Sequence, residues 1–481
     1  MGQVKEACGV FGVYARDVDV PHLVFDGLFA LQHRGQESAG MAVSDGDTVT
    51  VVKDMGLVTS VFDQRTLSSL QGHVALGHVR YSTTGPSTWQ NSQPVYRSVG
   101  NAGFALGHNG NLTNVEELAE AAGMLPGIVA SDSELVGELL ARAYPAVDRV
   151  GGEADTDLEQ ALLEVLPRLE GAFAFGLLDA THLVGVRDPN GFRPLCLGRI
   201  DPTPGAPEGG WVVASETPAL DIVGAELVRE IEPGEMVVID SDGPRSYRPF
   251  APERIDPRLC VFEFVYFARP DSRLLGREVH AARHRMGERL ALESPADADL
   301  VIGVPDSGVP AAEGFAARSG LPFGQGLVKN RYIGRTFIAP THEARVDGVR
   351  RKLNPLRESV SGRRLVVVDD SIVRGTTTRQ IVRMLRDAGA REVHLRISSP
   401  PFRWPCYYGI ATPDRSELVA AGMPVDEIAG HLGADSVGYL SLDGLVGSVG
   451  AGDAGFCTAC LTGRYPTRVP SAREPVASAH R

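Results

Sequence analysis

The stretch LVVVDDSIVRGTTT, residues 365–378, predicts the fold of the second half of the chain. Its first four residues are apolar and mostly β-branched, as in a strand that a parallel sheet buries on both faces. Two carboxylates, Asp369 and Asp370, follow at the end of this strand. A turn rich in Gly, Ser and Thr leads into residues 378–389, where apolar residues recur at helical spacing and Gly389 can end the helix. We therefore expect a strand, a polar loop and a helix.

The polar loop after this strand lies where α/β proteins bind ligands. In open α/β sheets the ligand crevice is at the carboxyl ends of the strands. A short loop before a helix offers backbone N–H groups to a phosphate, and two adjacent carboxylates suit ribose hydroxyls or Mg²⁺. An acidic pair after a strand can also be a solvated turn, so the pair alone does not identify a site. The complete block, with the residues that follow the pair, is far more specific than the pair.

With its Arg-Gly-Thr-Thr ending, the block resembles the phosphoribosyl-pyrophosphate loop of the type I phosphoribosyltransferases. The resemblance implies a parallel-sheet α/β domain, in which the acidic pair holds the ribose hydroxyls and residues 371–378 bind the 5′-phosphate. A second strand and polar loop, DLVIGVPDSG at residues 299–308, would be the pyrophosphate loop. The implied substrate contacts are Asp306, Ser307, Asp369, Asp370, Ser371, Arg374, Gly375, Thr376 and Thr377, and those to a single Mg²⁺ per subunit are Ser307, Asp369 and Asp370.

Residues 327–352 form a basic segment in an acidic chain. They contain seven Lys and Arg residues and two acidic residues, which gives +5, whereas the whole chain carries −13. A charge run is often a solvated face, but glycines and a proline interrupt this one. We expect a mobile lid that closes over pyrophosphate and screens the reaction from water. The family resemblance implies that Lys329, Arg331 and Arg335 are its pyrophosphate-binding positions.

The first half of the chain contains a different set of motifs. Together they resemble the glutaminase domain of the N-terminal-nucleophile amidotransferases over roughly residues 8–240. The resemblance implies a four-layer αββα domain, and helices expected at residues 132–144 and 157–169 agree with it. The motifs are CGVFGVY (8–14), LQHRGQESAG (31–40), GHVRYSTTG (77–85), GHNGNL (107–112) and SDSE (131–134).

Cys8 is the candidate nucleophile of this domain. A lone cysteine is more often a buried core thiol, but the motifs that follow favour catalysis. If residues 1–7 are removed, the new α-amino group lies on the nucleophile itself, and its pKa of about 8 suits proton transfer near neutrality. The resemblance implies that residues 1–7 are a propeptide and that Cys8 becomes the first residue.

The resemblance also implies the residues that bind glutamine. Arg80 would hold the α-carboxylate through its bidentate guanidinium, and Asp132 would bind the ammonium group. The side chain of Asn109 and the backbone N–H of Gly110 would form an oxyanion hole, where losing one donor costs about 10²–10³ in rate. The loop at residues 80–85 would tighten over glutamine when the second site is filled.

The six cysteines of the chain indicate metal binding or catalysis rather than disulfides, because the chain is large and lacks a secretory start. Cys457 and Cys460 are a two-residue-spaced pair, and Cys260 and Cys406 lie far away in sequence. Spacing alone leaves a zinc site and an iron–sulfur site open. The resemblance, to the iron–sulfur branch of the family, implies one [4Fe–4S] cluster per subunit on these four residues. Cys196 is expected to be a core thiol.

Composition limits the class of protein. The 481 residues suggest two or three domains, and the net charge of −13 argues against general nucleic-acid binding. No apolar run approaches the roughly 18 residues of a membrane span, so we expect a cytoplasmic protein with no membrane partner. Prolines at residues 249–257 mark a boundary between a glutaminase domain at residues 8–248 and a phosphoribosyltransferase domain at residues 258–465. Residues 466–481 are expected to be a disordered tail.

Both domains on one chain are the arrangement of the amidophosphoribosyltransferase family, which the chain resembles over about residues 8–465. This implies the first committed step of purine synthesis, in which ammonia from glutamine replaces the pyrophosphate of phosphoribosyl pyrophosphate. It also implies inhibition by purine nucleotides and a homodimer or homotetramer. Two alternatives are a non-catalytic regulator that binds phosphoribosyl pyrophosphate, which would need no nucleophile, and another amidotransferase, such as a hexosamine synthase, which would lack the acidic block.

Overall fold

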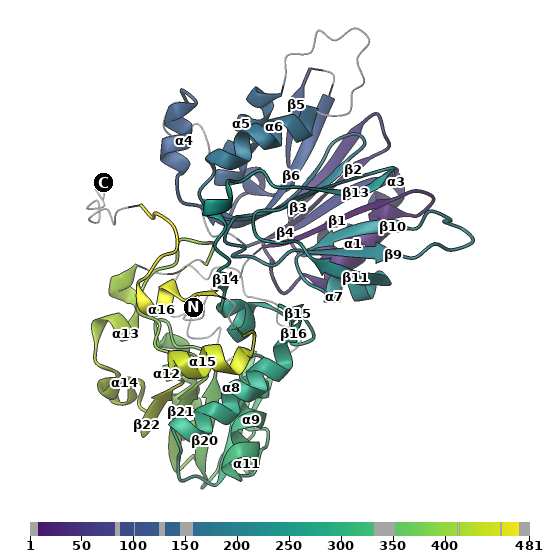
Figure 1. The fold of residues 1–481 in the computed structure, drawn as a ribbon. Helices are drawn as coiled ribbons and strands as arrows, with labels where there is room; N and C mark the ends of the chain where they lie inside the picture. The colour runs from purple at the N-terminus through teal and green to yellow at the C-terminus, as the bar shows by residue number, and fades with distance from the viewer. Residues whose placement is uncertain are drawn as a thin grey trace, which may run out of the picture. The chain divides into compact units, whose positions relative to one another are not determined.

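The structure is a computed structural model that describes residues 8–81, 87–100, 102–124, 130–144, 157–330, 352–410, 412, 414–452 and 455–470. The described chain divides into two units (Figure 1). The N-terminal unit consists of residues 8–259, 407–410 and 465–470, and the C-terminal unit consists of residues 260–406 and 412–464.

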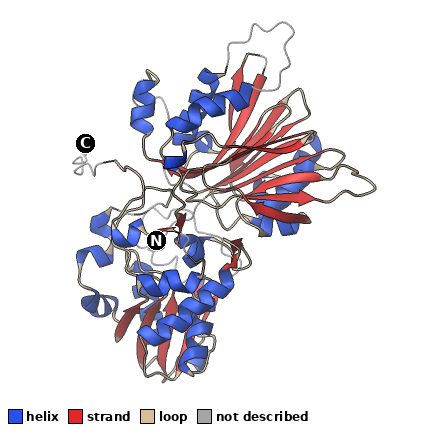
Figure 2. Cartoon of the chain, in the orientation of Figure 1, coloured by secondary structure: helices blue, strands red, loops and turns tan. Residues whose placement is uncertain are grey.

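Two antiparallel sheets build the N-terminal unit (Figure 2). One has seven strands in the order β11-β9-β10-β1-β4-β2-β3, and the other has six in the order β13-β12-β8-β7-β6-β5. The first comprises β1 (Gly9–Ala15), β2 (Ser38–Ser44), β3 (Val49–Met55), β4 (Val74–Arg80), β9 (Cys196–Ile200), β10 (Gly210–Ala214) and β11 (Ala225–Glu230). The second comprises β5 (Val95–Val99), β6 (Ala102–Leu112), β7 (Gly171–Leu178), β8 (Leu183–Arg187), β12 (Met236–Asp240) and β13 (Gly243–Tyr247).

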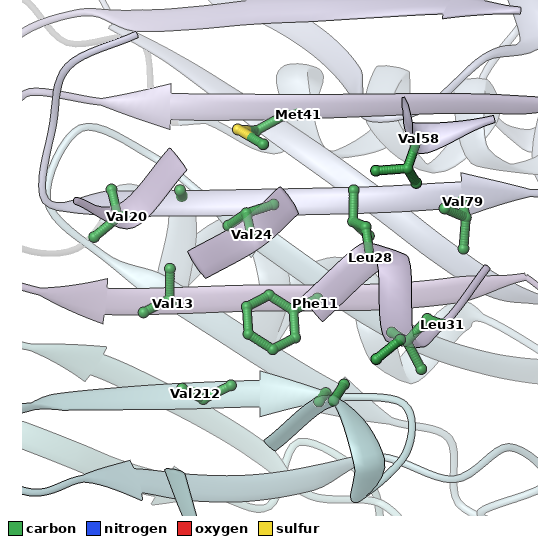
Figure 3. Close-up of a cluster of buried hydrophobic side chains, with 14 of the residues drawn as sticks. Phe11, Val13, Val20, Val24, Leu28, Leu31, Met41, Val58, Val79 and Val212 are labelled. Atoms are coloured by element: carbon green, nitrogen blue, oxygen red, sulfur yellow. The ribbon is translucent and has the colours of Figure 1, made fainter. Parts of the chain in front are cut away.

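The alternation of side chains along β1 explains the layers. Phe11 and Val13 point to one face and pack against α1 (Val20–Ala30), where Val24 and Leu28 meet them (Figure 3). Val10 points to the other face and packs between the two sheets. Further helices on the outer face of the seven-stranded sheet are α2 (Val58–Val61), α3 (Gln64–Ser69) and α7 (Pro218–Ile222).

The outer face of the six-stranded sheet is covered by α4 (Val115–Ala121), α5 (Asp132–Ala143) and α6 (Asp157–Val165). The unit therefore has four layers, which confirms the αββα fold expected from the sequence. The helix expected at residues 157–169 is shorter, because the chain tightens into a 3₁₀ turn at Leu166–Arg168 that contains Pro167.

A four-stranded parallel sheet in the order β17-β20-β21-β22 forms the centre of the C-terminal unit and confirms the expected α/β fold. Its central strand β20 is the apolar run of the first stretch quoted above. The helix after it begins at Thr376 rather than at residue 378, because Gly375 turns the chain with a φ of 74°. The strands are β17 (Leu300–Gly303), β20 (Arg364–Asp369), β21 (Glu392–Ile397) and β22 (Ser436–Tyr439).

Helices cover both faces of this sheet. On one face, α12 (Thr376–Asp387) and α14 (Val425–Leu432) pack against Leu365 and Val367. Helices α8 (Val279–Glu293), α9 (Val309–Ser319) and α15 (Leu442–Val449) pack together, with α9 against β17 and β20. The shorter elements are β14 (Leu259–Cys260), a π-helical turn (Glu263–Phe267), β15 (Arg273–Leu274), β16 (Arg277–Glu278), β18 (Leu327–Lys329), β19 (Leu353–Pro355), α11 (Arg357–Val360), α13 (Val419–Gly422), β23 (Phe456–Cys457) and α16 (Ala459–Thr462). None of the described helices is long and apolar enough to cross a membrane.

Two glycines bring α8 and α9 into backbone contact. A Cβ at Gly287 of α8 would lie 1.8 Å from the carbonyl oxygen of Ala311 in α9. A Cβ at Gly314 of α9 would lie 1.9 Å from the carbonyl oxygen of His284. The two helices can approach this closely only because both positions lack a side chain.

Replacing Gly287 with alanine should therefore destabilise the protein. The Gly287→Ala methyl group would meet a backbone oxygen, so we expect the free energy of unfolding to fall by about 2 kcal/mol or more. Gly430→Ala in α14 is the control, because it has no neighbour within 4 Å. It should stabilise by up to about 1 kcal/mol through helix propensity. Thermal unfolding of both variants checks this, and equal effects would contradict it.

Candidate active sites

The thiol of Cys8 is buried at the start of β1, with 7% of the residue exposed. Gly9 pairs with Val79 of β4, so Cys8 lies beside Arg80, the last residue of β4. The Cys8 Sγ donates a hydrogen bond of 3.5 Å to the carbonyl oxygen of Tyr81. Burial raises the pKa of the Cys8 thiol, while the backbone of Tyr81 and the positive charge of Arg80 lower it. A nucleophile in this position needs a base to accept its proton.

Charges of both signs surround this thiol. Arg80, Glu37 and Asp132 all act on the pKa of Cys8, which places the three charges around it. The carboxylate of Asp132 accepts hydrogen bonds from the backbone N–H groups of Ser133, at 2.8 Å, and Leu112, at 3.1 Å. Burial alone would raise the pKa of Asp132, but His108 and these N–H groups outweigh it and hold the pKa below its ordinary value. A buried cation and an ionised carboxylate beside one thiol match the two charges of an amino acid.

Asn109 of β6 is buried with its hydrogen-bonding groups unused. Neither its Oδ1 nor its Nδ2 has a hydrogen-bond partner among the described residues. A buried amide without partners costs about 1–3 kcal/mol, so such a group is expected where a ligand supplies the partner. The neighbouring His78 donates from Nε2 to the carbonyl oxygen of His108, at 3.0 Å, and joins β4 to β6. Burial lowers the pKa of His78 to about 3, so its ring is neutral.

Sequence reasoning gave no role to a buried ion pair that holds the backbone of Cys8. The Nε of Arg34 donates to the carbonyl oxygen of Cys8 at 3.0 Å, and the guanidinium pairs with Glu216. His33 also binds Glu216, with 2.8 Å between its Nε2 and Oε1. Arg34 lies in the motif at residues 31–40, so the sequence did carry a signal for it. Glu216 lies 182 residues further along the chain, and no local pattern marks it.

The predicted acidic pair of the C-terminal unit lies at the carboxyl end of β20. Asp369 and Asp370 are only 4% and 2% exposed. Ser307 and Ser371 each donate from Oγ to one carboxylate oxygen of Asp370, both at 2.6 Å. Burial raises the pKa of Asp369, and the charge of Asp370 raises it further. Burial also raises the pKa of Asp370, although the two serine hydroxyls oppose it. The pair therefore lacks a positive partner strong enough to offset its burial.

Parallel pairing brings the two predicted loops to one edge of this sheet. Gly303 of β17 pairs with Val368 of β20, so the loops at residues 304–308 and 369–375 leave the sheet side by side. At the end of the second loop, Gly375 begins α12 with Thr376 and Thr377 in its first turn. The first N–H groups of a helix have no intrahelical partner and suit an anion. Arg374 forms an ion pair of 2.8 Å with Glu417.

The basic segment is described only at its two ends. Lys329 lies 2.5 Å from a carboxylate oxygen of Asp306, measured from Nζ to Oδ2. β18 and β19 pair as an antiparallel ladder on either side of the segment. The predicted positions Arg331 and Arg335 lie outside the described residues, as do residues 82–85, the propeptide at residues 1–7 and the tail from residue 471.

Backbone contacts bring the four predicted cluster cysteines together in the C-terminal unit. The N–H of Val261, next to Cys260, donates to the carbonyl oxygen of Cys457 at 3.3 Å. The N–H groups of Arg403 and Trp404 donate to the carbonyl oxygen of Cys460, both at 3.0 Å. Burial raises the pKa of Cys460, and the neighbouring Cys406, Cys260 and Cys457 raise it further.

The four cysteines remain thiols in the structure. No three His, Cys, Asp or Glu side chains among the described residues are arranged to hold one metal ion. None of the six cysteines forms a disulfide. Cys196 is neither the candidate nucleophile nor one of the four cluster candidates. It is buried in the core between the seven-stranded sheet and α1, and its Sγ donates to the carbonyl oxygen of Ala214 at 3.2 Å.

Comparison with known domain families gives one match in each of the two units. The family model of the glutamine amidotransferase domain matches residues 78–221. The family model of the phosphoribosyl transferase domain matches residues 278–398.

Curated relatives match nearly the whole chain. An amidophosphoribosyltransferase from Mycobacterium tuberculosis is 54% identical over 479 residues, which cover 97% of this chain and 87% of the relative. An amidophosphoribosyltransferase from Bacillus subtilis is 44% identical over 473 residues and covers 97% of this chain and 95% of the relative.

Solved structures agree with these relatives. The structure of an allosteric regulatory enzyme of purine biosynthesis superposes with a TM-score of 0.87 at 44% identity and covers 97% of both chains. The Bacillus subtilis glutamine phosphoribosylpyrophosphate amidotransferase, solved with ADP and GMP, has a TM-score of 0.86 at 44% identity and covers 97% of this chain and 98% of its own. The chain therefore belongs to the amidophosphoribosyltransferase family, and it is an enzyme with a glutamine amidotransferase domain and a phosphoribosyltransferase domain.

Proposed function

We propose that this enzyme catalyses the first committed step of purine synthesis. Glutamine, 5-phosphoribosyl 1-pyrophosphate and water give 5-phosphoribosylamine, glutamate and pyrophosphate. The observation that carries the proposal is the buried pair Asp369 and Asp370 between two loops of a parallel sheet. A cysteine site alone would suit any glutamine amidotransferase, whereas this pair supplies the site for a ribose phosphate as acceptor.

The glutamine half of the reaction is assigned to the site around Cys8. Removal of residues 1–7 would free the α-amino group of Cys8, which takes the thiol proton while the sulfur attacks the amide carbon. Arg80 binds the α-carboxylate and Asp132 binds the ammonium group. The amide of Asn109, which has no partner in the described chain, and the N–H of Gly110 bind the oxyanion. Ammonia leaves, and water later releases glutamate from the sulfur.

The phosphoribosyl half is assigned to the edge of the parallel sheet. Asp369 and Asp370 accept hydrogen bonds from the ribose hydroxyls, and residues 371–377 bind the 5′-phosphate at the start of α12. Lys329, Arg331 and Arg335 supply positive charge for the pyrophosphate. Ser307, Asp369 and Asp370 would hold the Mg²⁺ of the substrate, whose charge stabilises the departing pyrophosphate. The raised pKa of the acidic pair fits this role, because a cation or hydroxyl donors would relieve its buried charge.

Ammonia must pass between the two reactions as the neutral molecule. Ammonium has no lone pair, so only NH₃ can attack C1 of the ribose. A dry passage from the Cys8 site to the ribose would keep it unprotonated.

The four cysteines Cys260, Cys406, Cys457 and Cys460 are proposed to bind one [4Fe–4S] cluster. Their backbone contacts gather them, and three of the four residues are buried. Four thiolates could hold a zinc ion or an iron–sulfur cluster, and the proposal of a cluster rests on the family resemblance. The cluster would hold the segments around the four cysteines together.

The regulation of this enzyme is proposed from a solved relative. The Bacillus subtilis relative was solved with ADP and GMP, which supports purine nucleotides as inhibitors of this enzyme. We further propose that it is a cytoplasmic homodimer or homotetramer.

The Cys8→Ala variant should separate the two reactions. Without the sulfur nucleophile, turnover with glutamine should fall below detection, whereas turnover with added ammonia should stay within about 2-fold. Pyrophosphate release with each nitrogen donor measures both rates. Cys196→Ala is the control, because Cys196 is a core thiol, and it should retain both activities. Loss of both activities in Cys8→Ala would argue against two sites joined by ammonia.

Replacing one member of the acidic pair should abolish activity and increase the free energy of unfolding. Asp369→Asn should abolish pyrophosphate release with either nitrogen donor. A carboxyl whose pKa is raised in the folded protein reduces stability as the pH rises above the ordinary pKa of the group. Since each pKa unit corresponds to about 1.4 kcal/mol, we expect the variant to be more stable at pH 7 by about 1 kcal/mol or more.

This gain should shrink as the pH falls and vanish below the ordinary aspartate pKa of about 4, because the carboxyl is then protonated in both the folded and the unfolded protein. Denaturant unfolding at several pH values measures it. Asp299→Asn is the control, because hydrogen bonds from Arg364 lower the pKa of Asp299 to about 2, and it should bring no gain. A pH-independent gain in Asp369→Asn would show that the buried charge is not its cause.

Protein purified without oxygen should contain iron and sulfide and absorb visible light. Cys457→Ser should lose the iron and the absorption, because one of the four ligands is gone, whereas Cys196→Ser should keep both. Metal analysis and the absorption spectrum check this. One zinc ion per chain without iron would contradict the cluster.

A further inference from the structure

A short segment from the second half of the sequence packs within the N-terminal unit. Tyr407–Ile410 belongs to this unit, whereas the preceding and following residues belong to the C-terminal unit. The N–H of Cys406 donates to Oγ1 of Thr412 at 2.8 Å, so a hydrogen bond joins the two sides of the chain that flank this segment. Tyr408 and Ile410 are buried, at 2% and 3% exposed. The segment is therefore a buried part of the unit that contains Cys8.

Arg193 holds this segment by its backbone. The Arg193 side chain is fully buried, and its Nε and one terminal nitrogen donate to the carbonyl oxygen of Tyr408 at 3.2 and 2.8 Å. The rings of Phe192 and Tyr408 are stacked, with 4.2 Å between centroids. The Tyr408 hydroxyl also lies 3.0 Å from Oγ1 of Thr467. The segment is thus fixed at its backbone, its ring and its hydroxyl.

The fixed segment lies directly against Gly110. Gly409 has a φ of 96°, and a Cβ there would lie 2.9 Å from the carbonyl carbon of Gly110 and 3.1 Å from the Arg193 guanidinium. The Nδ2 of Asn111 donates to the carbonyl oxygen of Tyr407 at 3.0 Å. On its own Cβ side, Gly110 has no free space, because a Cβ there would lie 2.1 Å from the carbonyl oxygen of Ala172. The Cα and the carbonyl group of Gly110, next to its N–H, are therefore confined between β7 and residues 407–409.

We propose that Tyr407–Ile410, held by Arg193, is a positioning element that fixes the oxyanion hole of the glutamine site. This inference rests on the proposed function, in which the N–H of Gly110 is an oxyanion donor. Such donors act at 2.7–3.1 Å from the developing charge, and misplacement by about 1 Å can cost about 10²-fold in rate. Residues 407–410 lie about three hundred positions beyond Gly110 in the chain, so the glutamine site takes one of its supports from the second half of the sequence.

The Gly409→Ala variant tests this contact. Its methyl group would push against Gly110, so kcat for glutamine hydrolysis should fall about 10- to 100-fold, with a smaller change in KM. The affinity for L-glutamate γ-semialdehyde, whose thiol adduct places an oxyanion in the hole, should fall in parallel. Alkylation of Cys8 by iodoacetamide and turnover with added ammonia should stay unchanged, because neither uses the oxyanion hole.

The matched control is Gly224→Ala. Gly224 also has a positive φ, 70°, but no atom lies within 4 Å of its Cβ position. Both variants therefore place an alanine at a positive φ, and only Gly409→Ala adds contacts, with Gly110 and with the guanidinium that holds the segment. Arg193→Lys is the second variant, for the case that Gly409→Ala does not fold. Arg193→Lys keeps the positive charge but cannot donate two hydrogen bonds to the carbonyl oxygen of Tyr408. It should therefore also lower kcat for glutamine hydrolysis and the affinity for the semialdehyde.

The outcomes separate this inference from the proposed function. If Gly409→Ala and Arg193→Lys match Gly224→Ala in kcat and semialdehyde affinity while Cys8→Ala loses glutamine use, the positioning role is wrong and the proposed function stands. If Cys8→Ala keeps glutamine use, the proposed function itself fails. Selective loss of kcat and semialdehyde affinity in the first two variants, with normal alkylation of Cys8, supports the positioning role.

Discussion

Both sites depend on one constraint. Each contains buried polar groups whose lost hydrogen bonds to water are not fully replaced by partners in the protein. Taking an ionised or hydrogen-bonding group out of water is costly unless a partner replaces the water. At Arg34 the protein replaces the lost water, because the guanidinium pairs with Glu216 and donates to the backbone of Cys8. At Asn109 the amide has no hydrogen-bond partner among the described residues, and at Asp369 and Asp370 burial raises the pKa of the carboxyl groups. The groups with full compensation hold the structure, and those without it are the groups to which we assign ligands.

The two units bring their buried polar residues together with different kinds of sheet. In the N-terminal unit, antiparallel pairing puts Cys8 at the start of one strand beside Arg80 at the end of its neighbour. In the C-terminal unit, parallel pairing puts the ends of β17 and β20 at one edge, so their loops meet. Charged residues thus converge where strands end, and the apolar strand interiors supply the rigid support that holds them there.

Sequence patterns predicted what is local and missed what is long-range. The run at residues 365–368 and its acidic pair predicted β20 and the sheet edge, because burial on both faces leaves a continuous apolar run. The αββα layers were implied by the family resemblance that the ordered motifs carry. The partner of Arg34 could not be predicted, because Glu216 is brought to it only by tertiary folding. The same holds for Arg193, whose acceptor, the carbonyl of Tyr408, is a backbone atom with no residue signature.

The long-range contacts change how the glutaminase domain should be understood. The candidate nucleophile Cys8 and the charged residues Arg80 and Asp132 all come from the first half of the sequence, but the packing around Gly110 does not. The carbonyl of Tyr408 satisfies the buried guanidinium of Arg193, so removing residues 407–410 would take an acceptor away from a fully buried cation. That loss is costly because the cation has no access to water. The unit that binds glutamine is therefore incomplete without residues that follow the phosphoribosyl loops in the chain.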